Sequence, residues 1–148
     1  MNRKLSLLSL MFALYLAATA AVARDDHNMY SLEDALNTPG AKEKLDPSIR
    51  LYFGAQKTPK VVKEHGEWRT NKKTNGFGKS DKTACEWVLL SALLELQERA
   101  RKEGGNAVIH IKSNYKNIER SSETEYMCGS GALMSGVALK GVVAEVAK

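Results

Sequence analysis

The feature that most constrains the fold is one long and unusually apolar helical segment, residues 83–102. Apolar residues recur in it at helical spacing and form one broad face that includes Trp87. Thr83 and Glu86 fit a capping box at its start, and Gly104 is a stop signal after its end. A helix with so much apolar surface needs a sheet or a partner to cover it. We therefore expect this helix, with Trp87, in the core.

Short segments rich in β-forming residues lie on both sides of this helix. The predicted strands are 49–53, 59–63, 106–112, 125–128 and 137–146. Residues 66–79 are polar and contain three glycines, so they are predicted to form a loop or a hairpin. Strands that are separated from one long helix in this way favour an α+β fold, with the helix packed on a small antiparallel sheet.

The N-terminal residues 1–23 have the features of a cleaved secretory signal. A basic start is followed by the apolar run Leu5–Val22, and Ala21-Val22-Ala23 is a small-x-small cleavage pattern. The alternative is a retained transmembrane anchor, because about 18 apolar residues can just span a bilayer. The sequence predicts cleavage after Ala23. The processed chain is then periplasmic or secreted and has no membrane span.

The processed chain is expected to form one domain with an N-terminal extension. In the extension, residues 24–48, the first five residues have no regular structure. Residues 31–37 form a short helix that begins at the N-cap Ser31 and is stopped by Pro39-Gly40. The α+β domain then covers residues 49–148.

The net charge argues against nucleic-acid binding, and the distribution of charge singles out one basic segment. Loss of Arg3 and Lys4 with the signal leaves 20 Lys+Arg against 17 Asp+Glu, too small an excess to indicate nucleic-acid binding. Between Gln56 and Lys82, however, eight cations face only three carboxylates. This stretch is either a solvated basic face or a loop that faces an anion.

The two cysteines, Cys85 and Cys128, lie near the start of the long helix and in a late strand. An oxidising compartment favours a disulfide between them. Closure of a loop of roughly 44 residues is worth about 4 kcal/mol in the chain-entropy model. Two separate thiols, a reactive thiol at the helix start, and a redox or metal role are the alternatives.

The segment before the long helix ends like a phosphate-binding loop. An intact Walker motif would need glycine at position 73, where Lys73 stands, and a buried strand before the loop. A Walker site is therefore disfavoured. Free backbone N–H groups at a helix start, with lysines beside them, still predict an anion site. Its candidate residues are Lys72, Lys73, Gly76, Gly78, Lys79 and Ser80. A flexible glycine-rich loop is the alternative.

Other chemistry has little support in the sequence. The three histidines do not stand at metal-ligand spacings, and no serine elbow or Ser–His–Asp set can be assembled. We predict no catalytic residue, no metal and no cofactor.

Five segments of the processed chain carry a family resemblance: Asn71–Ser80, Ala84–Trp87, Leu96–Arg101, Asn106–Val108 and Gly136–Gly141. They are similar to segments of short exported bacterial proteins that are often labelled "excinuclease ATPase subunit". That label implies an ATP-dependent DNA-repair subunit. The incomplete Walker motif and the signal segment disfavour this activity.

The segments Gly105–Val108 and Cys128–Leu133 carry a more distant resemblance, to the Rcs envelope-stress sensor lipoprotein and its relatives. It implies a disulfide-bonded α+β fold that faces the periplasm and works through protein contacts. The sequence thus favours a small exported, non-catalytic interaction or envelope-associated protein with an envelope protein as partner. The alternatives are an anion- or phosphate-binding module at Lys72–Ser80 and the ATP-dependent subunit.

Overall fold

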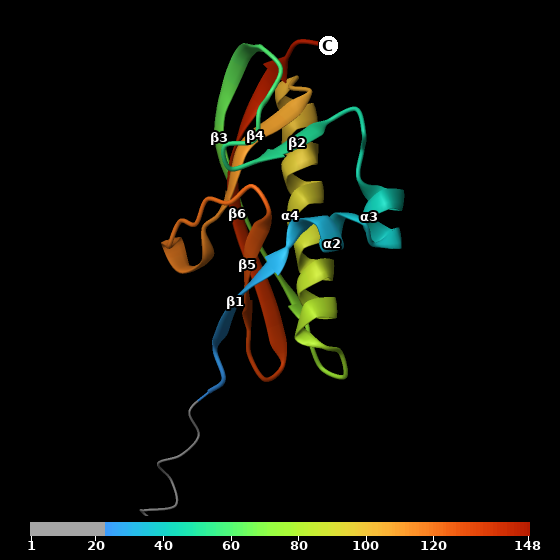
Figure 1. Ribbon diagram of the computed structural model, residues 1–148, viewed down its shortest axis with the longest axis vertical. Helices are drawn as coiled ribbons and strands as arrows, with labels where there is room; N and C mark the ends of the chain where they lie inside the picture. The colour runs from blue at the N-terminus through green and yellow to red at the C-terminus, as the bar shows by residue number, and fades with distance from the viewer. Residues whose placement is uncertain (1–22) are drawn as a thin grey trace, which may run out of the picture.

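The computed structural model describes residues 23–148 as α-helices packed on one curled β-sheet (Figure 1). The helices are α2 (Leu32–Leu36), α3 (Pro39–Lys44) and α4 (Asp81–Glu103), with a 3-10 turn η1 (Tyr115–Asn117). The strands are β1 (Asp26–Ser31), β2 (Arg50–Phe53), β3 (Val61–Asn75), β4 (Ala107–Ser113), β5 (Glu125–Ser130) and β6 (Met134–Val146). Mixed helix and strand content is confirmed. The prediction of one long helix on a small sheet is wrong, because six strands make the sheet the dominant element.

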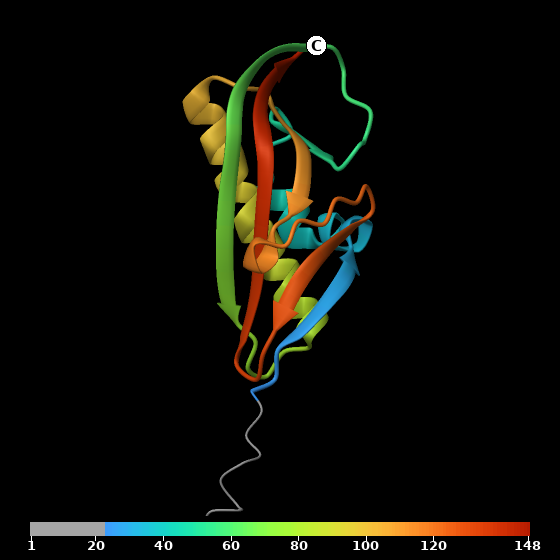
Figure 2. The same cartoon turned by 90° about the vertical axis from the view of Figure 1, so that its left-hand side faces the viewer.

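The sheet is organised around β6, which is long enough to serve several partners (Figure 2). One edge of β6 pairs with β3 along its length, while β5 and β4 share the other edge. β1 continues the sheet beyond β5, and β2 continues it beyond β4. The β2–β4 pair is parallel, so the prediction of an antiparallel sheet holds only for the other pairs. The chain passes through β3 and α4 between these two strands, and such a crossover returns it in the same direction.

The prediction of a loop or a hairpin over residues 66–79 is wrong as far as Asn75, because this part belongs to β3. The strand continues through this polar segment to Asn75, and its partners run along β6 to Met134. Backbone hydrogen bonds to β6 hold it, so its side chains need no continuous apolar pattern. Gly66, at φ +116°, lies where the register shifts. Among the described residues β3 pairs only with β6, so its other edge is free.

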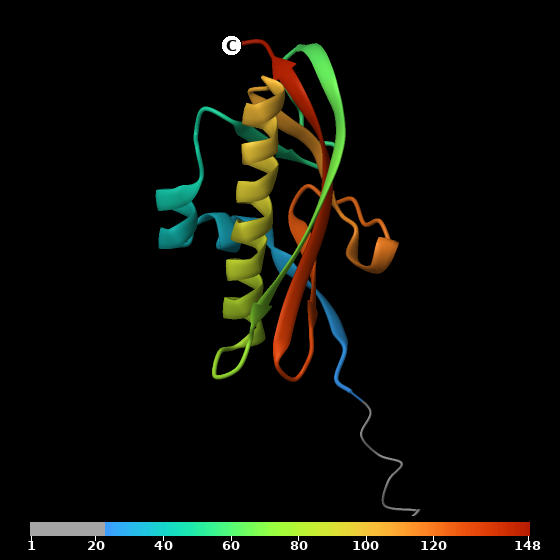
Figure 3. The same cartoon turned by 180° about the vertical axis from the view of Figure 1, so that it is seen from behind.

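α4 lies along one face of the sheet, and the main core fills the space between them (Figure 3). Its largest members from the helix are Leu89, Leu93 and Leu96, and each is about 1% exposed. The helix begins at Asp81 with Ser80 as N-cap, three residues before the predicted Thr83. Trp87 is not in the core, because it lies on the side of α4 that faces α3 and is 48% exposed.

The segment predicted as an N-terminal extension contributes β1 to the same sheet. β1 pairs with β5 from Asp26 onward, so the expected irregular start is a strand for most of its length. α2 follows inside the predicted helical segment, and the Ser31 hydroxyl accepts a hydrogen bond from the Asp34 N–H at 3.1 Å. The predicted signal, apart from Ala23, lies outside the described residues. Within residues 23–148 no helix combines the length and apolarity that crossing a bilayer requires.

Candidate functional site

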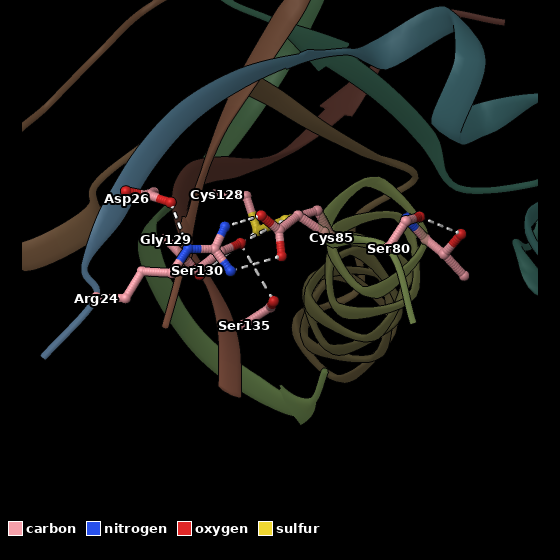
Figure 4. Close-up of polar contacts among 10 residues, drawn as sticks. Arg24, Asp26, Ser80, Cys85, Cys128, Gly129, Ser130 and Ser135 are labelled. Carbon is pink, nitrogen blue, oxygen red and sulfur yellow. Dashed lines mark hydrogen bonds and ion pairs between the residues drawn. A yellow bond between two sulfur atoms is a disulfide. The ribbon is translucent and has the colours of Figure 1, made fainter. Parts of the chain in front are cut away.

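The two cysteines form a buried bond between α4 and β5. A disulfide joins Cys85 and Cys128, which confirms the predicted pairing, and both residues are fully buried (Figure 4). The Ser130 hydroxyl lies 3.5 Å from the Cys85 sulfur and 3.3 Å from the Ser135 hydroxyl. Neither sulfur is a free thiol, so a nucleophilic Cys85 is not present in this state. A buried disulfide is compatible with an extracytoplasmic protein.

The start of α4 is already capped by the chain itself. The Ser80 hydroxyl accepts a hydrogen bond from the Thr83 N–H at 3.1 Å, and Asp81 places a carboxylate in the first turn. Arg24 forms an ion pair with this carboxylate and a second one with Asp26 at 2.6 Å, and both raise its pKa (Figure 4). One N–H of this helix start is therefore already taken by a hydroxyl, and the first turn already carries a carboxylate.

The lysines of the predicted anion loop do not converge on one point. Lys72 lies on the α4 face of β3, where its ammonium pairs with Glu95 at 2.7 Å and lowers the pKa of that carboxyl. Lys73 is the next residue of the strand and so points to the opposite face. Lys79 lies in the turn after β3, with its ammonium 3.4 Å from the carbonyl of Asn75. The six predicted residues share one end of the molecule but do not form one cationic pocket.

An apolar groove runs between α4 and the start of α3, and we call it the Trp87 groove. It has a volume of about 260 Å³. Its lining consists of Thr38, Pro39, Gly40, Thr83, Glu86, Trp87 and Leu90. The Lys44 ammonium lies 5.3 Å from the centre of the Trp87 ring, in a cation–π contact. Apolar walls and an indole at the surface allow the groove to bury an apolar side chain of another molecule.

The charges at one end of the Trp87 groove compensate each other. Lys82 pairs with Asp34 at 2.9 Å and with Glu86 at 3.3 Å, and these carboxylates raise its pKa. The groove is therefore suited to an uncharged apolar group rather than to an ion. The sequence prediction missed this site because it placed Trp87 in the core. The signal was the width of the apolar face of α4, on which Trp87 lies outside the part that packs in the main core.

A second charged cluster lies on the sheet face opposite α4. The side chain of Lys140 is only 9% exposed there, and its ammonium pairs with Glu119 and, at 3.5 Å, with Glu67. Glu119 also pairs with Lys112 at 2.9 Å. The two lysines, Lys140 first, lower the pKa of Glu119 to about 2. This cluster fastens the loop between β4 and β5 to the sheet.

The histidines lie on separate elements. His27 lies beside Asp25 at 3.0 Å, His65 lies 3.8 Å from Glu145, and His110 approaches the Gly54 carbonyl at 3.3 Å. In the part of the chain that the structure describes, no group of three or more His, Cys, Asp or Glu residues is arranged to hold a metal ion.

In the described residues these three histidines, the disulfide and the capped helix start do not assemble a reaction centre. Among the cavities we take the Trp87 groove as the candidate site, because it is the one beside the half-exposed indole of Trp87. No protein-family model matches the chain, and the comparisons with curated proteins and with solved structures find no match either.

Proposed function

We propose that this chain is a small exported, non-catalytic protein that binds an envelope protein through the Trp87 groove. The observation that carries the proposal is the half-exposed indole of Trp87 beside an apolar groove of about 260 Å³. Tryptophan is among the residues that most often dominate the binding energy of protein interfaces. The partner presents an apolar side chain, because the nearby charges are already engaged. Lys82 pairs with Asp34 and Glu86, and the Lys44 ammonium lies over the Trp87 ring.

The geometry of the groove favours a short contact rather than a large interface. Its volume holds one or two apolar side chains, and α3, a helix of six residues, contributes only Pro39 and Gly40 to one wall. The Thr38 hydroxyl accepts a hydrogen bond from the Ala41 N–H at 3.3 Å, and this N-cap holds the first turn of α3 in place. A preformed pocket loses little conformational freedom on binding, which supports affinity from a small contact.

The test is site-specific crosslinking in cells, followed by a binding measurement. A photoreactive residue at position 83, on the exposed rim of the groove, is expected to capture one envelope protein. Capture is expected to disappear when Trp87→Ala is added. With the captured protein purified, Trp87→Ala is expected to weaken binding about thirtyfold, which corresponds to about 2 kcal/mol.

Phe77→Ala is the matched control, because Phe77 is 74% exposed and does not line the groove. It is expected to bind the partner as tightly as the unmodified chain. Equal affinity of Trp87→Ala and the unmodified chain would overturn the proposal. So would ATP hydrolysis that disappears in Lys79→Ala, because that result would make the protein an enzyme.

A further inference from the structure

Two turns from distant parts of the chain meet at one end of the molecule. The turn after β3, residues 76–80, and the turn between β5 and β6, residues 131–133, lie side by side at the lower end of all three ribbon views (Figures 1–3). The Gly76 N–H donates to the Leu133 carbonyl at 2.8 Å and joins them. We call this end the tip.

The tip exposes three large apolar side chains. Phe77 is 74% exposed, Leu133 60% and Met134 46%. Single exposed apolar residues are ordinary on protein surfaces, whereas a group of them at one place marks a protein or membrane interaction site. Phe77 and Leu133 lie in the two turns and Met134 is the first residue of β6, so all three are exposed at the same end of the molecule. Exposed apolar side chains at one end can insert into the apolar layer of a bilayer.

The tip is held in shape by its own hydrogen bonds. The Asn75 side chain accepts from the Phe77 N–H at 2.8 Å, and the Lys79 N–H donates to the Gly76 carbonyl at 3.1 Å. In the other turn the Gly131 N–H donates to the Met134 carbonyl at 2.8 Å. The apolar side chains are therefore presented by fixed turns and need little ordering on contact.

Cations flank these apolar side chains. Lys73 and Lys79 are both exposed, and neither forms an ion pair with a carboxylate among the described residues. The nearby acids Asp26 and Asp81 are both paired with Arg24. Exposed apolar side chains flanked by lysines that have no carboxylate partner suit a bilayer whose surface carries anionic headgroups.

We propose that the tip is a membrane-contact surface that binds an anionic lipid bilayer, with Phe77, Leu133 and Met134 in the interface and Lys73 and Lys79 on the headgroups. This inference is independent of the Trp87 groove, which lies along the side of α4. It also explains why the lysines of the predicted anion loop do not form a pocket. Lysines that contact the headgroups of a flat bilayer do not need to converge on a single point.

The test is co-sedimentation of the exported protein with vesicles, with its disulfide intact and its start at Arg24 verified by mass. The vesicles are phosphatidylcholine alone or phosphatidylcholine mixed with phosphatidylglycerol. Binding is expected only to the mixed vesicles. Replacement of both lysines, Lys73→Gln with Lys79→Gln, is expected to weaken that binding by about tenfold or more. Phe77→Ser with Leu133→Ser is expected to abolish it.

Val62→Ser is the matched control, because Val62 is 65% exposed and lies at the end of β3 away from the tip, and this variant is expected to bind vesicles normally. Thermal melting checks that all variants are folded. A paramagnetic lipid is expected to broaden the amide signals of residues 76–80 and 131–134 before others. Equal binding of Phe77→Ser/Leu133→Ser and the unmodified chain, or no binding to mixed vesicles, would overturn the proposal. Release by inorganic phosphate at constant ionic strength would assign the lysines to a soluble anion and would also overturn it.

Discussion

Reduction of the disulfide is expected to remove about 4 kcal/mol from the free energy of unfolding. Cys85 and Cys128 are 43 positions apart, so their bond closes a loop of about 44 residues in the unfolded chain. In the chain-entropy model, ΔS for such a loop is about −13 cal/mol/K, which is about 4 kcal/mol at 25 °C. For a domain of this size the unfolding entropy is about 0.26 kcal/mol/K at the midpoint. The melting temperature should therefore fall by about 15 °C.

The assay is urea unfolding and thermal melting of the oxidised protein, the reduced protein and the double variant Cys85→Ala/Cys128→Ala. Both sulfurs are fully buried, so the double variant also leaves cavities and should lose roughly 1–2 kcal/mol more than the reduced protein. The m-value should rise on reduction, because the unfolded chain expands and exposes more surface. A reduced protein within about 1 kcal/mol of the oxidised one, with the same m-value, would refute the reasoning.

Two further predictions concern the loop between β4 and β5 and the turn after β2. Because the pKa of Glu119 is lowered from 4.5 to about 2 in the folded protein, its ion pair with Lys140 stabilises the fold above pH 4.5, and this stability is lost as the pH falls toward 2. The difference in melting temperature between the unmodified chain and Glu119→Gln should therefore shrink over this range, and a difference that does not depend on pH would contradict the assignment. Gly54→Ala and Gly78→Ala both place alanine at positive φ, at +56° and +72°, but only at Gly54 would the new Cβ lie 2.9 Å from the Ser122 backbone. Urea unfolding should therefore show that Gly54→Ala loses roughly 1–3 kcal/mol more than Gly78→Ala, and equal losses would argue against this close approach.

The parts of the fold with strong local signals could be predicted from the sequence. The helix was predicted over 83–102 and observed over Asp81–Glu103, because its apolar residues recur at 3.6-residue spacing. The disulfide followed from an inferred oxidising compartment and from the presence of two cysteines, which allow one intramolecular pairing. Such signals lie in the neighbouring residues or in simple counting, so no knowledge of the tertiary structure is needed.

The parts that depend on tertiary partners could not be predicted in the same way. β3 has charged side chains on both faces and lacks an apolar period, so only β6 beside it explains why residues 66–75 are a strand. The direction of β2 relative to β4 depends on the crossover through α4. Trp87 follows the apolar period of its helix and is nevertheless half exposed, because α3 covers its side of α4 only in part. The Trp87 groove could not be predicted for the same reason, because it lies where α3 leaves this side of α4 partly uncovered.

The free edge of β3 bears on self-association. Fifteen residues of strand with one unpaired backbone edge would ordinarily be a template on which a second copy could polymerise. Here the register shift in the β3–β6 pairing at Gly66 bends the strand, and four cations outnumber two carboxylates along it. Two such edges brought together would repel each other, so concentrated solutions of this protein should resist fibre formation without any cap over the strand.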